Sequence, residues 1–144
     1  MSDPNALDEA ALAPYLEAAV PGFHGFQGLR KFDSGQSNPT YLVEAESGRY
    51  VLRAKPPGQL LKSAHQVDRE YRVMAALKDT AVPVPDMLHL AGEDSPIGRM
   101  FYVMAFVEGR IFWDPALPEI SSASGRGALY DAMNRVLAAL HDVD

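Results

Sequence analysis

Cysteine is absent from the 144-residue chain, and so are long apolar runs, basic clusters and low-complexity tracts. Without cysteine the chain forms neither disulfides nor thiolate metal sites, and it has no cysteine nucleophile. No apolar run approaches the ~20 residues that span a bilayer, and no basic stretch precedes an apolar one at the N-terminus, as it does in a signal peptide. These absences predict a cytoplasmic protein with no membrane partner.

Positive charge is also scarce, because 13 Lys and Arg stand against 19 Asp and Glu for a formal net charge of -6. Nucleic acid and anionic lipid are therefore not expected partners. The hydrophobic fraction of 47% and the charged fraction of 22% are typical of a folded globular protein. The length predicts one compact unit or one lobe of a larger enzyme.

Hydrophobic periodicity and turn residues predict three helices and five strands. Helices are expected at 7–20, from a Ser63–Gln66 capping box to about 78, and at 127–143; strands are expected at 28–34, 40–45, 49–54, 86–91 and 99–106. Pro14 indicates that the first helix is shorter and has the proline in its first turn.

The order of these elements predicts an α+β fold: a five-stranded antiparallel sheet, one helix inserted after the third strand, and a helix at each end. We divide the chain into an N-terminal helical segment (1–27), the sheet with its inserted helix (28–109), and a loop-rich connector with the last helix (110–144).

A polar turn, Ser34-Gly-Gln-Ser-Asn-Pro-Thr-Tyr41, joins the first two expected strands. Small residues let backbone N–H groups approach a phosphate, and Ser37, Asn38 and Thr40 add polar side chains. Taken alone, an ordinary hairpin turn explains this stretch better, because one glycine makes neither a P-loop nor a full kinase glycine loop.

Two charged residues lie at unusual places. Arg53 shares a face of its strand with Val51, and Glu70 lies inside the apolar stripe of the inserted helix. A carboxylate there is costly unless a cation meets it, and Arg53 is the candidate cation. Alternatively, Arg53 at the end of its strand and Glu70 at the edge of the stripe could each point into water without meeting.

The apolar stretch from Met100 to Gly109 is either an inner strand or the wall of a cleft that offers backbone groups to an adenine ring. His24, His65 and His89 fall on different elements, and they form neither a metal-binding nor a catalytic-triad pattern.

The order of these features resembles the small lobe of protein-kinase-like enzymes. The sequence of these segments is similar to the aminoglycoside phosphotransferase family, in the branch whose domains occur alone in bacteria or fused to acyl-CoA dehydrogenases. The resemblance covers nearly the whole chain from about residue 28 onward, and the matching segments are Ser34–Tyr41, Tyr50–Arg53, Ser63–Tyr71, Val82–Pro85, Phe101–Gly109 and Tyr130–His141.

The resemblance implies the nucleotide-binding lobe of an ATP-dependent phosphotransferase that acts on a hydroxyl group of a small molecule. The turn would cover the phosphates, Arg53 would contact them with Glu70 as its ion-pair partner, Met104 would lie behind the adenine, and the backbone of Ala105 and Val107 would meet the base. The implied nucleotide-binding residues are Gly35, Gln36, Ser37, Asn38, Thr40, Arg53, Glu70, Met104, Ala105 and Val107.

In the family, the catalytic aspartate and the Mg²⁺ ligands lie in a second, larger lobe, so we expect no catalytic or metal residue here and no turnover by these 144 residues. A stand-alone, non-catalytic nucleotide-binding or assembly module is the alternative. A generic domain without a nucleotide site requires all the motifs to coincide by chance. The apolar stripe of helix 127–143 predicts self-association, because bare patches tend to bind something; its members are Leu129, Met133, Val136, Leu137 and Leu140.

Overall fold

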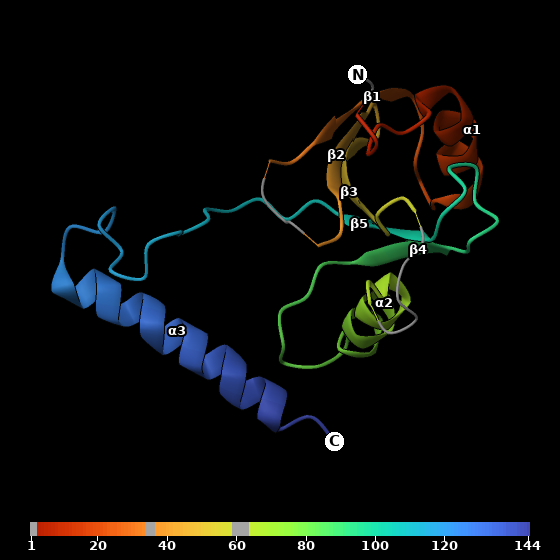
Figure 1. Ribbon diagram of the computed structural model, residues 1–144. Coiled ribbons are helices and arrows are strands. Elements are labelled where there is room, and N and C mark those ends of the chain that lie inside the picture. The colour runs from red at the N-terminus through yellow and green to blue at the C-terminus, as the bar shows by residue number, and fades with distance from the viewer. Residues whose placement is uncertain (1–2, 34–36, 59–63) are drawn as a thin grey trace.

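The computed structural model describes residues 3–33, 37–58 and 64–144, and Figure 1 shows their arrangement. The helices are α1 (Glu9–Ala19), α2 (Val67–Ala76) and α3 (Ala123–His141). The strands are β1 (Phe26–Lys31), β2 (Thr40–Ala45), β3 (Gly48–Ala54), β4 (Met87–Ala91) and β5 (Phe101–Ala105). Over the described residues the strands form one antiparallel sheet in the order β1-β2-β3-β5-β4, which confirms the predicted α+β fold.

Alternation along the strands gives the sheet two different faces. We call the first the α1 face, because Leu12 and Leu16 of α1 pack there against the sheet. Its core also contains Tyr41, Val43, Leu52, Phe101 and Val103, all almost completely buried. The opposite, α2 face carries the intervening side chains, among them Thr40, Arg53, Tyr102 and Met104.

Helix α1 extends further to the N-terminal side of its proline than the sequence predicted. The Asp8 side chain accepts hydrogen bonds from the backbone N–H groups of Ala10 and Ala11, so the helix begins at Glu9. Pro14 therefore lies inside the helix and not in its first turn. Its side chain is exposed, so the carbonyl group that loses its helical partner can bond to water.

The three-stranded part follows the expected meander. β2 has the predicted bounds, and the β2–β3 hairpin closes at Glu46-Ser47-Gly48. β1 begins two residues earlier than predicted and ends at Lys31, where its pairing with Tyr41 stops. β4 and β5 are slightly shorter than expected, and both join the same sheet.

Helix α2 begins at Val67, later than the predicted capping box implies. Gln66 is the N-cap residue and makes no side-chain capping bond, and Ser63 lies outside the described residues. The side chain of Val67 is fully buried, so packing fixes the start of this helix. α2 lies against β4 and β5.

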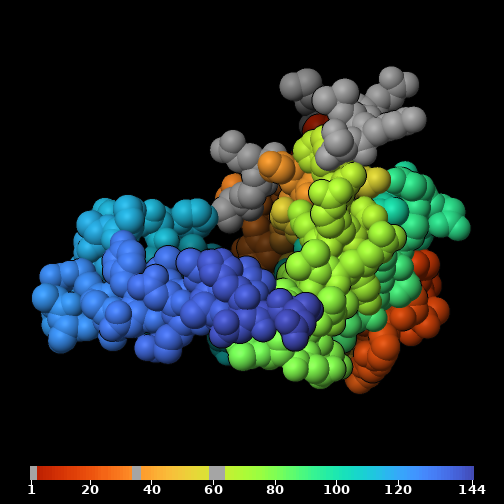
Figure 2. Space-filling view, turned by 90° about the horizontal axis from the view of Figure 1, so that it is seen from below, coloured from red at the N-terminus to blue at the C-terminus, as the bar shows by residue number. Residues whose placement is uncertain are grey.

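Helix α3 begins at Ala123, four residues before the predicted start, because the Ser122 hydroxyl caps it by accepting from the Gly125 N–H. None of its residues is buried. It stands away from the sheet, and its C-terminal end comes close to α2 (Figures 1 and 2). No helix in the described part of the chain is long and apolar enough to cross a membrane.

Candidate functional site

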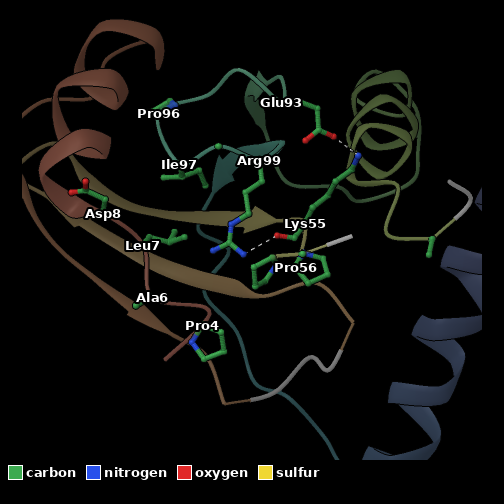
Figure 3. A pocket seen from close by; sticks show the side chains of 14 residues that line it. Pro4, Ala6, Leu7, Asp8, Lys55, Pro56, Glu93, Pro96, Ile97 and Arg99 are labelled. Atoms are coloured by element: carbon green, nitrogen blue, oxygen red, sulfur yellow. Dashed lines mark hydrogen bonds and ion pairs between the residues drawn. The ribbon is translucent and has the colours of Figure 1, made fainter. Parts of the chain in front are cut away.

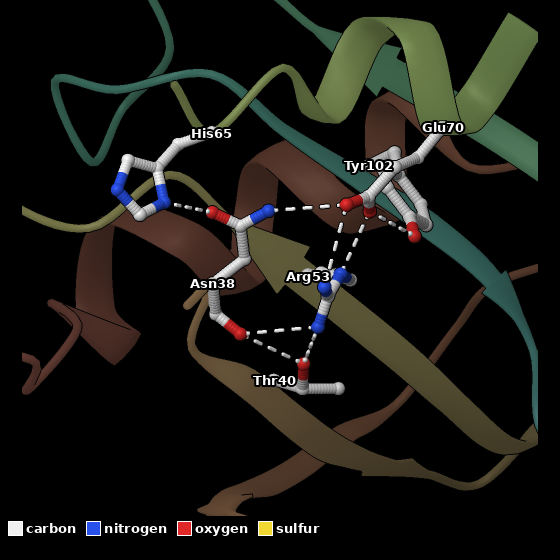
Figure 4. Close-up of polar contacts among 6 residues, drawn as sticks. All are labelled: Asn38, Thr40, Arg53, His65, Glu70 and Tyr102. Carbon is white, nitrogen blue, oxygen red and sulfur yellow. Dashed lines mark hydrogen bonds and ion pairs between the residues drawn. The ribbon is translucent and has the colours of Figure 1, made fainter. Parts of the chain in front are cut away.

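A two-point ion pair between Arg53 and Glu70 joins β3 to α2 on the α2 face (Figure 4). Nε of Arg53 lies 2.7 Å from Oε2 of Glu70, and Nη2 lies 3.3 Å from Oε1. The structure thus brings together the two charged residues that the sequence singled out. Two parallel N–H···O bonds fix orientation as well as distance, which a lysine could not do.

The pair is mostly shielded from water, with side-chain exposures of 25% for Arg53 and 35% for Glu70. Burial alone would raise the pKa of Glu70, but the hydrogen bond and charge of Arg53, helped by Tyr102 and Asn38, lower it below its usual value. Burial alone would lower the pKa of Arg53, and Glu70 raises it instead. Both groups are therefore ionised at neutral pH.

The turn between β1 and β2 is tied to this pair through Asn38 and Thr40. Nη1 of Arg53 donates to the Asn38 carbonyl oxygen at 3.1 Å and to the Thr40 hydroxyl at 2.8 Å. The Asn38 side-chain amide donates to Oε1 of Glu70 at 3.1 Å. Asn38 is only 3% exposed, so its polar atoms are satisfied by protein and not by water.

Two further residues complete the network, and the sequence analysis missed both. The Tyr102 hydroxyl donates to Oε2 of Glu70 at 3.0 Å, and Nδ1 of His65 lies 2.8 Å from the Asn38 side-chain oxygen. Burial, followed by the charge of Glu70, raises the pKa of Tyr102 far above its usual value, so this hydroxyl keeps its proton. No sequence signal identified Tyr102, because its place directly across from Arg53 depends on the β3–β5 pairing, which the fold establishes.

His65 adopts a backbone φ of 59°, in the left-handed region that residues other than glycine occupy infrequently. Such a conformation persists where the surroundings enforce it. Here the bond to Asn38 links the segment before α2 to the β1–β2 turn. No sequence signal predicts that His65 links these two segments, because the spacing of the histidines along the chain follows no recognisable motif.

An apolar cavity of about 600 Å³ lies beside the far end of β5. Val51 and Met104 form its wall on the sheet, Pro83 to Pro85 form another, and Ala105 and Val107 lie along its edge. The Ala105 N–H is already donated to the Asp86 carbonyl oxygen at 2.8 Å, so Ala105 can offer a ligand only its carbonyl. Among the described residues the Val107 N–H has no acceptor, and it is open to a ligand.

The remaining sequence-predicted residues divide into two groups. Ser37 is exposed beside the network, whereas Gly35 and Gln36 lie outside the described residues. In the described part of the chain, no three His, Asp or Glu side chains gather into a group that could hold a metal ion.

This arrangement has counterparts in known proteins. Residues 28–144 match the family model of the phosphotransferase enzyme family. The chain belongs to this family. Family members generally use ATP and Mg²⁺, and this phosphotransferase-family chain carries the kinase-like fold with its strand cation and helix carboxylate paired.

Relatives of this phosphotransferase-family chain include much longer proteins. It is 52% identical over 121 residues to the Arabidopsis thaliana "Probable acyl-CoA dehydrogenase IBR3", covering 81% of this chain and 15% of that protein. It is 46% identical over 141 residues to mouse acyl-CoA dehydrogenase family member 10, covering 96% of this chain and 13% of that protein.

A solved structure agrees with the fold. A Ralstonia eutropha protein described as a candidate aminoglycoside phosphotransferase superposes with a TM-score of 0.81 at 45% identity. The match covers 96% of this chain and 39% of that protein. The chain therefore spans a minor part of each of these relatives, and both kinds of relative agree with the family resemblance read from the sequence.

Proposed function

We propose that this chain is the nucleotide-binding lobe of an ATP-dependent phosphotransferase that acts on a hydroxyl group of a small molecule. The observation that carries the proposal is the Arg53–Glu70 pair, held against the β1–β2 turn on the same sheet face as an apolar cavity. Arg53 of the pair supplies a guanidinium in a fixed position, the turn supplies backbone groups, and the cavity supplies a place for a flat base.

Arg53 acts on the phosphates mainly through its charge and its position. A guanidinium has five N–H donors, and four contacts to Glu70, Asn38 and Thr40 already engage Nε, Nη1 and Nη2. One Nη2 donor is left for a phosphate oxygen. Arg53 therefore shapes the turn and holds a charge beneath it, and most of the hydrogen bonds to the phosphates come from the turn itself.

The adenine ring lies in the apolar cavity with Met104 behind it. The carbonyl oxygen of Ala105 accepts from the exocyclic amino group of the base, and the Val107 N–H donates to a ring nitrogen. These two backbone groups replace hydrogen bonds to water, while the apolar walls shield the ring faces. The small side chain of Ala105 takes no part in this recognition, because the contacts use the backbone.

The described residues do not fit a Mg²⁺ site, so no step of the reaction is assigned to a metal held by them. The metal ligands and the catalytic base belong to a second lobe in the complete enzyme, as does the site for the hydroxyl acceptor. We place the protein in the cytoplasm. The alternative is a module with the same nucleotide site that binds without catalysing transfer.

Nucleotide titration of the chain tests the proposal. We expect calorimetry to detect ATP binding. Arg53→Met should weaken ATP binding about tenfold, as the loss of one charged contact predicts. Val107→Pro should also weaken ATP binding, because it removes the open N–H at this position. Lys55→Met is the matched control, because Lys55 pairs with Glu93 away from the network and should leave ATP affinity unchanged. Equal affinities for the Arg53 variant and the wild type would refute the assigned role. A complete protein that binds ATP but transfers no phosphoryl group would support the non-catalytic module.

A further inference from the structure

A second cavity of about 600 Å³ lies on the α1 face, away from the ion-pair network (Figure 3). The segment before α1, the start of the β3–α2 connection and the β4–β5 hairpin enclose it. Leu7, Ile97 and several prolines give it apolar walls, and Arg99 and Lys55 bring positive charge into it. Its volume falls within the about 300–1,000 Å³ typical of small-molecule sites.

Arg99 is the feature of this cavity that needs an explanation. Its side chain is a guanidinium on a residue only 8% exposed, and Figure 3 shows it reaching into the cavity between Leu7 and Pro56. Nη1 donates to the Lys55 carbonyl oxygen at 3.2 Å. A guanidinium in a residue this buried is stabilised when an opposite charge meets it.

No carboxylate of the residues that the structure describes pairs with Arg99. Among the described residues none lies within salt-bridge distance of it, and residues 1–2, 34–36 and 59–63 include no Asp or Glu. Tyr41 lies near enough for Arg99 to lower its pKa, against the stronger opposite effect of burial, but a neutral hydroxyl brings no charge.

The two acids that line the cavity are already engaged. Asp8 caps α1 by accepting from Ala10 and Ala11, and Glu93 pairs with Nζ of Lys55 at 2.6 Å. Lys55 and Glu93 neutralise each other, and the helix N-terminus stabilises Asp8. Among the charged side chains that line the cavity, Arg99 is therefore the one without a carboxylate partner.

We propose that this cavity binds a small organic anion, whose carboxylate or phosphate group pairs with Arg99 while its apolar body packs against Leu7 and Ile97. A guanidinium binds both kinds of oxyanion through two parallel hydrogen bonds, and at Arg99 the donors beyond those to the Lys55 carbonyl and the Tyr41 hydroxyl are available for them. The ligand supplies the counter-charge that the chain does not.

This site is independent of the proposed nucleotide site. Arg99 lies two residues before Phe101, whose side chain belongs to the α1 face, whereas Arg53, Glu70 and Tyr102 meet on the α2 face. An anion bound at one site contacts none of the residues of the other.

The test is a titration of the isotope-labelled chain with inorganic phosphate and, separately, with benzoate at low ionic strength, followed by backbone amide NMR. We expect saturable shifts at Lys55, Ile97, Gly98 and Arg99 with at least one of the two probes. Phosphate alone would identify the ligand as a phosphate ester, and benzoate alone as a carboxylate. No saturable shift at these amides with either probe would overturn the proposal.

Matched variants separate the two cationic sites. We expect Arg99→Gln to weaken binding of the effective probe about tenfold or more, and Arg53→Gln to leave the shifts around Arg99 unchanged. Arg99→Lys keeps the charge without the planar fork, so it should fold if Arg99→Gln does not and bind with intermediate affinity. Shifts that vanish in Arg53→Gln and persist in Arg99→Gln would assign the anion to the nucleotide site and refute a second site.

Discussion

Arg53 ties two parts of the molecule to its own strand, β3, because its guanidinium contacts α2 through Glu70 and the β1–β2 turn through Asn38 and Thr40. We expect Arg53→Ala to lower the free energy of unfolding by about 2 kcal/mol, as expected for lost hydrogen bonds to a charged group. Arg53→Lys should recover part of this loss, because an ammonium keeps the charge without the two-point geometry. Urea unfolding measures both.

The control for this prediction is Arg49→Ala. Arg49 lies 3.4 Å from Glu108, and both side chains are largely exposed, at 47% and 85%. Exposed pairs contribute about 0–1 kcal/mol, so this variant should stay close to the wild type. A loss as large as that of Arg53→Ala would mean that charge alone, and not the buried network, sets the effect.

Glu70 makes the stability of the network depend on pH in the acid range. Its pKa is lowered in the folded protein, so the unfolded chain takes up a proton first as the pH falls through about 4.3. The stabilisation from Glu70 is thus complete above that pH and decreases below it. Glu70→Gln should be less stable than the wild type at pH 7, and the gap should narrow at pH 3.5 in urea unfolding. A gap of constant size would contradict this assignment.

Asn38 offers a sharper electrostatic test, because its side-chain amide donates to the carboxylate of Glu70. Asn38→Asp keeps the shape of the side chain but replaces the donor with an acceptor. It also adds a second negative charge beside Glu70, at a residue that is only 3% exposed. We expect a loss of about 2–3 kcal/mol at pH 7 and a smaller loss at pH 4, where protonation restores a donor. Thermal unfolding at the two pH values checks this, and an equal loss at both would refute it.

At the scale of elements, α1 and β4 meet through a hydrogen bond between the Tyr15 hydroxyl and Nε2 of His89, 2.8 Å long. Burial lowers the pKa of His89, so the unfolded chain binds its proton at a higher pH than the folded one. Stability should therefore fall as the pH drops below about 6.5. His89→Gln cannot titrate and should show a flatter stability curve between pH 7 and pH 5. A curve of unchanged slope would show that His89 is not the group responsible.

The elements that the sequence predicted best are those whose limits are set locally. β2 begins after Pro39 and ends at a Glu-Ser-Gly turn, and both signals can be read directly. Two helix starts were misplaced: packing sets the first, and glycines, which disfavour helix, hid the adjacent cap of the second. α2 starts where Val67 enters the core, and α3 starts at the Ser122 cap despite two glycines in its first turns.

The candidate site shows the same division. The meeting of Arg53 with Glu70 could be predicted because a carboxylate in an apolar stripe requires a cation. The contributions of Tyr102 and His65 could not, because the first reads as one apolar strand residue and the second depends on a rare backbone angle. Strand alternation places side chains on a face, but it does not show which of them meet across a loop.

At the scale of the whole molecule, α3 presents an apolar surface to water. Met133, Val136, Leu137 and Leu140 are 39–63% exposed, and no residue of the helix is buried. We propose that the chain self-associates through this stripe. Light scattering should give a mass above that of one chain at high concentration, and Leu137→Glu should reduce it. Asn134→Glu, on the same helix but outside the stripe, is the control. A single-chain mass for the wild type at every concentration would refute self-association.

The Asn38–Thr40 end of the β1–β2 turn limits how this sequence can diverge. One nitrogen of Arg53 reaches both the Asn38 carbonyl and the Thr40 hydroxyl, so an inserted or deleted residue between them would break two contacts together. Ser37 faces water, so its replacement would leave these two contacts in place. Over evolutionary time the length of the chain from Asn38 to β2 must therefore stay constant.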